Sequence, residues 1–424
     1  MKTFSYSKTF LLGFGFFGVS VIWATYNAYV PLMLDGKFGL SAWWIGVFMV
    51  LDNVAALLIQ PPVGAWSDRL RTPLGRRLPF ILIGAPVGAV FFGLLPVISI
   101  LPLFAVCAGG LLISMAFWRT PVVALMPDIT PSQYRSQANG IINFMGGLGS
   151  VVSFAVGSML YARNPGYAFW LGSALVLVSA LLVVLFIREP KVFDEKEQEK
   201  LPNILVSVKM VFGEKEKSAA RILLAIFFWF LSYNAIEAFF TLYGVNHLGL
   251  AEADSAFQLT YISLVFLIFA LPAGYIGASF GRRRTIMTGI ALMGLAILVL
   301  YFTPTALLTA KFAQVTKTAG LYPLSLVLMV AGFAWAMINI NSLPMVVDMT
   351  EDVRIGTYTG LYYFASTLAA ITGPVMFGGV VGLSNNNYNL MMLLSPIFLI
   401  LAWVMMLGVR RGEAKKLSSL ESQE

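Results

Sequence analysis

Three ionisable residues lie inside long apolar segments of this 424-residue chain: Asp52, Arg119 and Glu237. Such a group within a bilayer costs about 3 kcal/mol or more, so it usually serves a function. Asp52 lies about three helical turns before a charged loop, and Arg119 lies two to three turns before Asp128. Equal depth would let the two side chains pair. We hypothesise that Asp52 takes up a proton or cation and that Arg119 tunes its proton affinity; the alternative is a static ion pair that fixes two helices.

Glu237 has no basic residue near its expected depth in the second half of the chain. A desolvated, unpaired carboxyl is expected to keep its proton near neutral pH. It could then donate a hydrogen bond to a bound hydroxyl or act as a second protonation site. Tyr233, Asn234 and Thr241 follow helical spacing with Glu237 and form one polar stripe, although a stripe that only contacts a neighbouring helix would look the same.

Aromatic and amide side chains within the apolar segments are candidates for binding a hydroxyl-rich solute. Aromatic faces pack against C–H surfaces, and amides form paired hydrogen bonds with hydroxyls. Each could instead be an interfacial anchor or a bridge between helices. The candidates are Trp23, Tyr26, Asn27, Asn139, Asn143, Tyr233, Asn234, Trp335, Asn339, Tyr358 and Tyr362.

Charged residues near the ends of the apolar segments form a second group. We expect them to latch helix ends in one conformation, with Asp68 favoured near a helix N-terminus. Asp128 with Arg135, and Asp348 with Arg354, are expected to form matching latches in the two halves. An ordinary charged loop that only sets orientation is the alternative. The set is Asp68, Arg69, Arg76, Arg77, Asp128, Arg135, Asp348 and Arg354.

The elements that would position these residues are membrane helices. Hydrophobic residues make up 58% of the chain and charged residues 11%, whereas soluble domains have about 25% charged residues. The mean hydropathy is +0.82. A bilayer needs about 20 apolar residues per helix. Twelve segments meet this, near 10–32, 42–65, 78–99, 103–126, 137–160, 167–187, 222–243, 257–279, 285–308, 322–346, 356–381 and 388–408.

The net charge of +8 follows the membrane rather than forming one nucleic-acid-binding face. With the N-terminus inside, only Lys37, Arg163, Lys311 and Lys317 of the 28 basic residues fall in outer loops. The positive-inside rule therefore predicts a multi-pass protein of the plasma (inner) membrane with both termini cytoplasmic. The polar stretch near 188–221 divides the chain into a bundle at 1–190, a linker at 191–219 and a bundle at 220–424.

Two sequence motifs of the first half recur in the second half. Ala124–Gly140 (ALMPDITPSQYRSQANG) matches Pro344–Gly360 (PMVVDMTEDVRIGTYTG), with Asp128 and Asp348 220 residues apart. Gly64–Arg77 (GAWSDRLRTPLGRR) is echoed by Gly274–Arg284 (GYIGASFGRRR), which lacks the acid. Two parallel six-helix repeats with a site between them near the midplane are typical of major facilitator transporters.

The Gly64–Arg77 loop resembles the signature loop of major facilitators. Gln60–Ile81 (QPPVGAWSDRLRTPLGRRLPFI) and Trp118–Asn139 (WRTPVVALMPDITPSQYRSQAN) are similar to the sucrose–proton symporters and their relatives, which are close to the glycoside–pentoside–hexuronide symporters. The chain departs from the plant pattern at Leu112 and Val123, so the coupling residues of that family do not carry over.

The resemblance implies an all-α membrane protein of the major facilitator fold that imports a di- or oligosaccharide or glucoside by cation symport. A proton is the leading coupling ion and sodium the other. No phosphate-binding loop or metal cluster occurs, so no cofactor, metal or enzyme activity is expected. The expected partners are a sugar-like solute and the lipid bilayer, with no nucleic acid, and the expected state is a monomer. A drug or other small-solute antiporter of the same fold is the alternative.

Overall fold

The computed structural model describes residues 5–130, 134–189, 204–350 and 354–413. Twelve helical spans in these ranges are long and apolar enough to cross a membrane, which confirms the predicted number. The elements are α1 (Tyr6–Gly36), α2 (Ala42–Met49), α3 (Leu51–Arg69), α4 (Leu78–Leu94), η1 (Leu95–Val97), α5 (Leu101–Ile129), α6 (Arg135–Tyr161), α7 (Pro165–Phe186), α8 (Ile204–Gly213), α9 (Ser218–Asn246), α10 (Glu252–Phe280), α11 (Arg282–Phe302), α12 (Thr305–Leu308), β1 (Ala313–Gln314), β2 (Gly320–Leu321), α13 (Pro323–Val347), α14 (Ile355–Leu383) and α15 (Asn389–Leu407).

The second span differs from the expected single helix. The helix is interrupted at Val50, which separates α2 from α3 and places Asp52 in the first turn of α3. A carboxylate is favoured there because the first backbone N–H groups of a helix lack helical partners. The interruption thus positions the acidic side chain that the sequence singles out.

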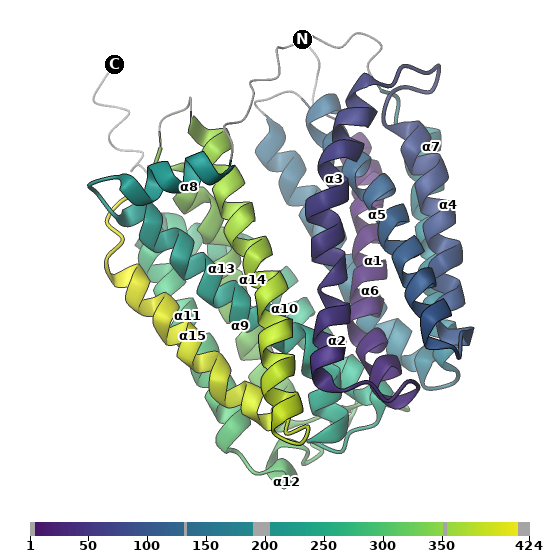
Figure 1. The fold of residues 1–424 in the computed structure, drawn as a ribbon, viewed down its shortest axis with the longest axis vertical. Coiled ribbons are helices and arrows are strands. Elements are labelled where there is room, and N and C mark those ends of the chain that lie inside the picture. The colour runs from purple at the N-terminus through teal and green to yellow at the C-terminus, as the bar shows by residue number, and fades with distance from the viewer. Residues whose placement is uncertain (1–4, 131–133, 190–203, 351–353, 414–424) are drawn as a thin grey trace.

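The helices form two groups that follow one another in the chain, as the colours of Figure 1 show. In the first group, α1 packs on α6 and α7; in the second, α9 packs on α14 and α15. The main contacts between the groups are α2 with α14 and α6 with α10. Because α2–α3 corresponds to α10 and α6 to α14 in the two repeats, the interface is itself symmetric.

The expected linker, 191–219, lies partly outside the described residues. Its described part holds the short helix α8 beside the second group (Figure 1).

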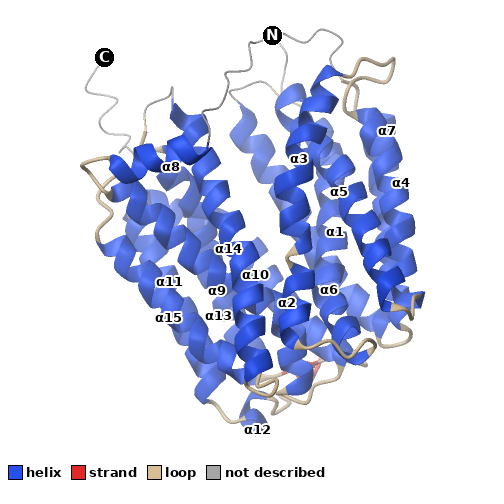
Figure 2. Cartoon of the chain, viewed as in Figure 1, coloured by secondary structure: helices blue, strands red, loops and turns tan. Residues whose placement is uncertain are grey.

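The two groups touch at the end of the bundle remote from the chain termini, here called the far end (Figure 2). The Tyr161 hydroxyl donates to the Glu252 carboxylate at 2.7 Å, and the Asn246 amide donates to Asp35 at 3.1 Å. Backbones also approach closely, because a Cβ added at Gly46 would overlap the carbonyl oxygen of Pro374. The opposite end, which carries the termini, is called the terminal end.

Candidate substrate and coupling site

A polar cavity of about 170 Å³ lies between α1, α3 and α5 in the first half. It contains two of the three ionisable residues predicted from the sequence, Asp52 and Arg119. Its lining is Trp23, Asn27, Asp52, Asn53, Ala56, Gln60, Leu112, Met115, Ala116 and Arg119. Carboxylate, guanidinium and amide groups together can bind hydroxyls and charged groups of a small solute.

Asp52 and Arg119 do not form the predicted ion pair. The Asp52 carboxylate instead accepts hydrogen bonds from the Asn53 backbone N–H at 2.6 Å and from its side-chain amide at 2.7 Å. Among the described residues, the ion pairs within 4.0 Å do not include Arg119. The two groups interact through the electrostatic field across the cavity. The physical reason is the start of α3, which directs the carboxylate toward the neighbouring N–H group.

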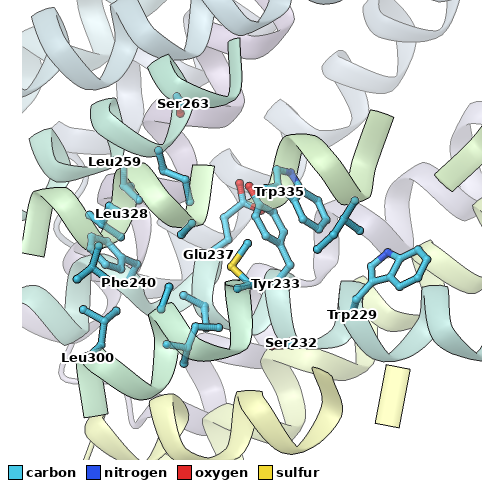
Figure 3. Close-up of a pocket in the computed structure, with 18 of the residues that line it drawn as sticks. Trp229, Ser232, Tyr233, Glu237, Phe240, Leu259, Ser263, Leu300, Leu328 and Trp335 are labelled. Carbon is cyan, nitrogen blue, oxygen red and sulfur yellow. The ribbon is translucent and has the colours of Figure 1, made fainter. Parts of the chain in front are cut away.

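A second cavity lies in the other half, and its lining is mainly apolar. Figure 3 shows Glu237 beside the aromatic rings of Tyr233 and Trp335. These rings stack face to face, with centroids 3.8 Å apart and planes within 5°. The other lining residues are Asn27, Phe154, Trp229, Ser232, Ile236, Phe240, Leu259, Ile262, Ser263, Met293, Ala296, Ile297, Leu300, Val327, Leu328, Ala331, Ile338 and Leu399.

Asn27 joins the two cavities, since it lines both of them. Its side-chain amide lies close to the Glu237 carboxyl, and Glu237 also lies in the field of Asp52. One amide on α1 therefore links the polar cavity of the first half to the carboxyl of the second half. This contact crosses the interface between the repeats, where the fold was expected to hold its solute site.

The remaining substrate candidates do not line either cavity. Tyr26 is buried against Trp23 at a centroid distance of 5.8 Å, and its hydroxyl has no partner among the described residues. Asn234 and Asn143 donate to backbone carbonyls of their own helices, at Phe230 and Asn139.

Apart from Trp335, the candidates from α13 and α14 also lie outside the cavities. The Tyr362 hydroxyl bonds the Ser342 hydroxyl at 3.0 Å, and Asn339 lines neither cavity. The Tyr358 hydroxyl donates to Glu214 at 3.0 Å. It therefore contacts the segment after α8 instead of a solute, because it lies in the first turn of α14 at the terminal end.

The charged residues at the terminal end of the first half form a compact cluster. Arg76 and Arg77 donate to Asp128 at 2.6 and 3.1 Å, and Arg77 also binds Asp68 and Ser67. Asp128 therefore pairs with the start of α4, not with Arg135 as predicted. The reason is that antiparallel α4 and α5 bring their termini together, whereas the Arg135 guanidinium donates to the Pro127 carbonyl oxygen, at 3.5 Å, and pairs with no acid among the described residues.

Glu189 completes this cluster, and the sequence analysis missed it. Its carboxylate accepts the backbone N–H groups of Arg76, Arg77 and Leu78 at 2.8, 2.7 and 2.8 Å. These N–H groups lie at the start of α4 and in the two residues before it, where a negative charge is favoured. Gly75, with a φ of +116°, makes the turn that presents them.

The second half repeats this cluster. Asp348 pairs with Arg282 at the start of α11, not with Arg354 as predicted. The Glu413 carboxylate accepts the backbone N–H groups of Arg282 and Arg283 at 2.6 and 3.2 Å. Gly281, with a φ of +96°, occupies the place of Gly75. Arg69, like Arg354, is exposed and forms no pair with a described residue.

Periodicity could have revealed some of the missed cavity residues. Asp52, Ala56 and Gln60 recur at four-residue intervals and therefore share one face of α3, and Trp229 precedes Tyr233 by the same interval on α9.

Two repeated helical bundles around a midplane site define a membrane carrier. The family model of the Major Facilitator Superfamily matches residues 12–268 and 246–424, so the chain belongs to this superfamily and has its fold. The fold agrees with the nucleoside transporter NupG, which superimposes with a TM-score of 0.75 at 16% identity over 95% of this chain and all of that one.

Three curated relatives show the range of solutes within this superfamily. Multidrug resistance protein 1 of Bacillus subtilis is 25% identical over 52% of this chain and 54% of its own length, so this match spans about half of that relative. The hexuronate transporter of Bacillus subtilis is 24% identical over 81% of this chain and 80% of its own. Proton-associated sugar transporter A of Homo sapiens is 39% identical, over 18% of this chain and 10% of its own.

Proposed function

We propose that the protein is a secondary active transporter that imports a sugar, a di- or oligosaccharide or a glucoside, by cation symport. A proton is the proposed coupling ion. The observation that supports this proposal is the polar cavity of about 170 Å³, which is lined by Asp52, Arg119 and three amide side chains. Amides and charged groups suit hydroxyl binding, and a carboxyl within a span is suited to gain and lose a proton.

Transport would proceed by alternating access, in which the two bundles rock around the central site. We place the protein in the plasma (inner) membrane with both termini in the cytoplasm. In that orientation the contacts at the far end close the outer side of the protein. The described conformation is then inward-facing. In this proposal the protein works as a monomer in the bilayer.

The local similarity to a proton-associated sugar transporter and the longer similarity to a hexuronate transporter support a sugar as solute. A second candidate is a drug–proton antiporter of the same fold. The mainly apolar lining around Glu237 favours it, as does the similarity to a multidrug resistance protein. An apolar cavity with one carboxyl would suit a lipophilic cation.

Uptake into proteoliposomes with an imposed pH gradient tests the proposal. A panel of glucosides and disaccharides should include at least one solute that accumulates when the outside is acidic. Asp52→Asn should abolish accumulation but preserve exchange of that solute down its gradient. Glu216→Gln, which removes an exposed carboxylate at the terminal end, is the matched control and should transport normally. No accumulation of any sugar, with proton-driven efflux of lipophilic cations, would favour the antiporter.

A further inference from the structure

Arg119 is a guanidinium at membrane depth without a carboxylate in contact. Within the described part of the chain, it forms no ion pair within 4.0 Å and donates no hydrogen bond to a protein group. Its side chain nevertheless lines the polar cavity. A guanidinium presents five N–H donors in a planar fork, which matches a carboxylate. A desolvated charge of this kind calls for an anion or a set of hydrogen bonds.

The protein does not supply that anion directly. Asp52 is an acidic group whose field acts on Arg119, and its carboxylate is engaged by Asn53. Glu237 lies close to the Asn27 amide and in the field of Asp52. The other titratable groups facing this pair are phenols, Tyr26 near Asp52 and Tyr363 near Arg119. The donors of Arg119 thus remain available to a solute.

We propose that the solute is an anionic sugar, of the uronic-acid class, whose carboxylate is bound by Arg119. This inference rests on the proposed sugar transport and narrows its substrate class. The amides of Asn27, Asn53 and Gln60 line the same cavity and can bind the ring hydroxyls. A neutral sugar would leave the guanidinium without its anion.

The same arrangement links the proton to the solute. When Asp52 is ionised, its negative charge offsets that of Arg119 and repels a second carboxylate. When Asp52 is protonated, Arg119 keeps its charge and the solute carboxylate becomes its counter-ion. Each of the two ligands therefore raises the affinity for the other by the same factor. Anion binding should weaken as the pH rises and Asp52 loses its proton.

Binding of three probes to the purified full-length protein in nanodiscs tests the proposal without any gradient. The probes are 4-nitrophenyl β-D-glucuronide, the matched 4-nitrophenyl β-D-glucoside, and phenylacetate, a carboxylate without hydroxyls. We expect the glucuronide to bind between about tenfold and a hundredfold more tightly than the glucoside, as one charge-assisted pair implies. Phenylacetate should bind weakly because it leaves the amides unused.

Equal binding of glucuronide and glucoside would overturn the anion site and leave sugar transport standing. Phenylacetate binding as tightly as the glucuronide would support the anion site but overturn the sugar. Binding of none of the three probes would overturn both proposals. These comparisons use the unmodified protein and do not depend on a variant that folds.

Two variants then assign the effect to Arg119. Arg119→Gln should remove the preference for glucuronide over glucoside, and Arg163→Gln, an exposed arginine at the far end, should leave it unchanged. Asp52→Asn should bind the glucuronide with little dependence on pH. A preference that persists in Arg119→Gln would contradict the assignment.

Discussion

Removal of the hydroxyl of Tyr161 should change the conformational equilibrium of the protein. Tyr161→Phe deletes the hydrogen bond of 2.7 Å to Glu252 that joins the two bundles at the far end. The ring itself remains stacked on Tyr29, with centroids 4.0 Å apart and planes within 10°. A hydrogen bond to a charged group contributes about 1.5–3 kcal/mol. Because Glu252 is exposed to solvent, we take about 1–1.5 kcal/mol for this one.

This free energy acts only in the conformation whose far end is closed. Its loss should therefore shift the population toward the opposite conformation by roughly five- to tenfold. The distance between spin labels at Phe186→Cys and Phe280→Cys, which lie on different bundles at the terminal end, reports this shift in a Cys107→Ser background. We expect a larger fraction of short distances in Tyr161→Phe. Tyr167→Phe removes an exposed hydroxyl and is the control. An unchanged distance distribution, or the same change in the control, would refute the reasoning.

Three further changes test other parts of the structure. Glu189→Gln should lower the free energy of unfolding by about 1–2 kcal/mol because α4 loses its carboxylate cap, and a fall in the thermal midpoint checks this. Gly46→Leu should open the far end in the same distance assay, because its side chain cannot fit against the backbone of α14, whereas Gly36→Ala, in open space, should not. Trp335→Leu should lower the free energy of unfolding by about 0.5–1.5 kcal/mol or more, measured as a fall in the thermal midpoint, because the Tyr233 ring loses its stacking partner.

The spans could be predicted because their cause is local. A run of about 20 apolar residues can satisfy its backbone in lipid only as a helix. Helical depth also predicted that Asp52 and Arg119 lie at comparable depth in the same half, and both line the polar cavity. Their separation could not be predicted, because the break at Val50 and the resulting bond to Asn53 depend on backbone geometry.

The contacts that were missed join groups far apart in the chain. Glu189 binds backbone N–H groups of residues 76–78. Every residue except proline has such a donor, so the sequence does not indicate which ones bind a carboxylate. One signal was present: Glu189 and Glu413 lie 224 residues apart, close to the 220 residues that separate Asp128 from Asp348. The proximity of Asn27 to Glu237 had no such signal, because it depends on how the two bundles meet.

The two repeats have kept their symmetry in one place and lost it in another. The terminal clusters share a glycine turn, arginines, an aspartate and a capping glutamate, although Asp68 has no counterpart in the second half. The cavities do not match: the first holds Asp52 and Arg119, and the second is mainly apolar around Glu237. Rocking of two bundles needs equivalent contacts at equivalent helix ends, so selection on that motion preserves the symmetry. A solute without a twofold axis needs different groups on its two sides. Selection on solute binding therefore removes the symmetry between the two cavities. The residues that differ between the two cavities should therefore determine which solute binds. Arg119, which has no counterpart in the second cavity, is the clearest of these differences.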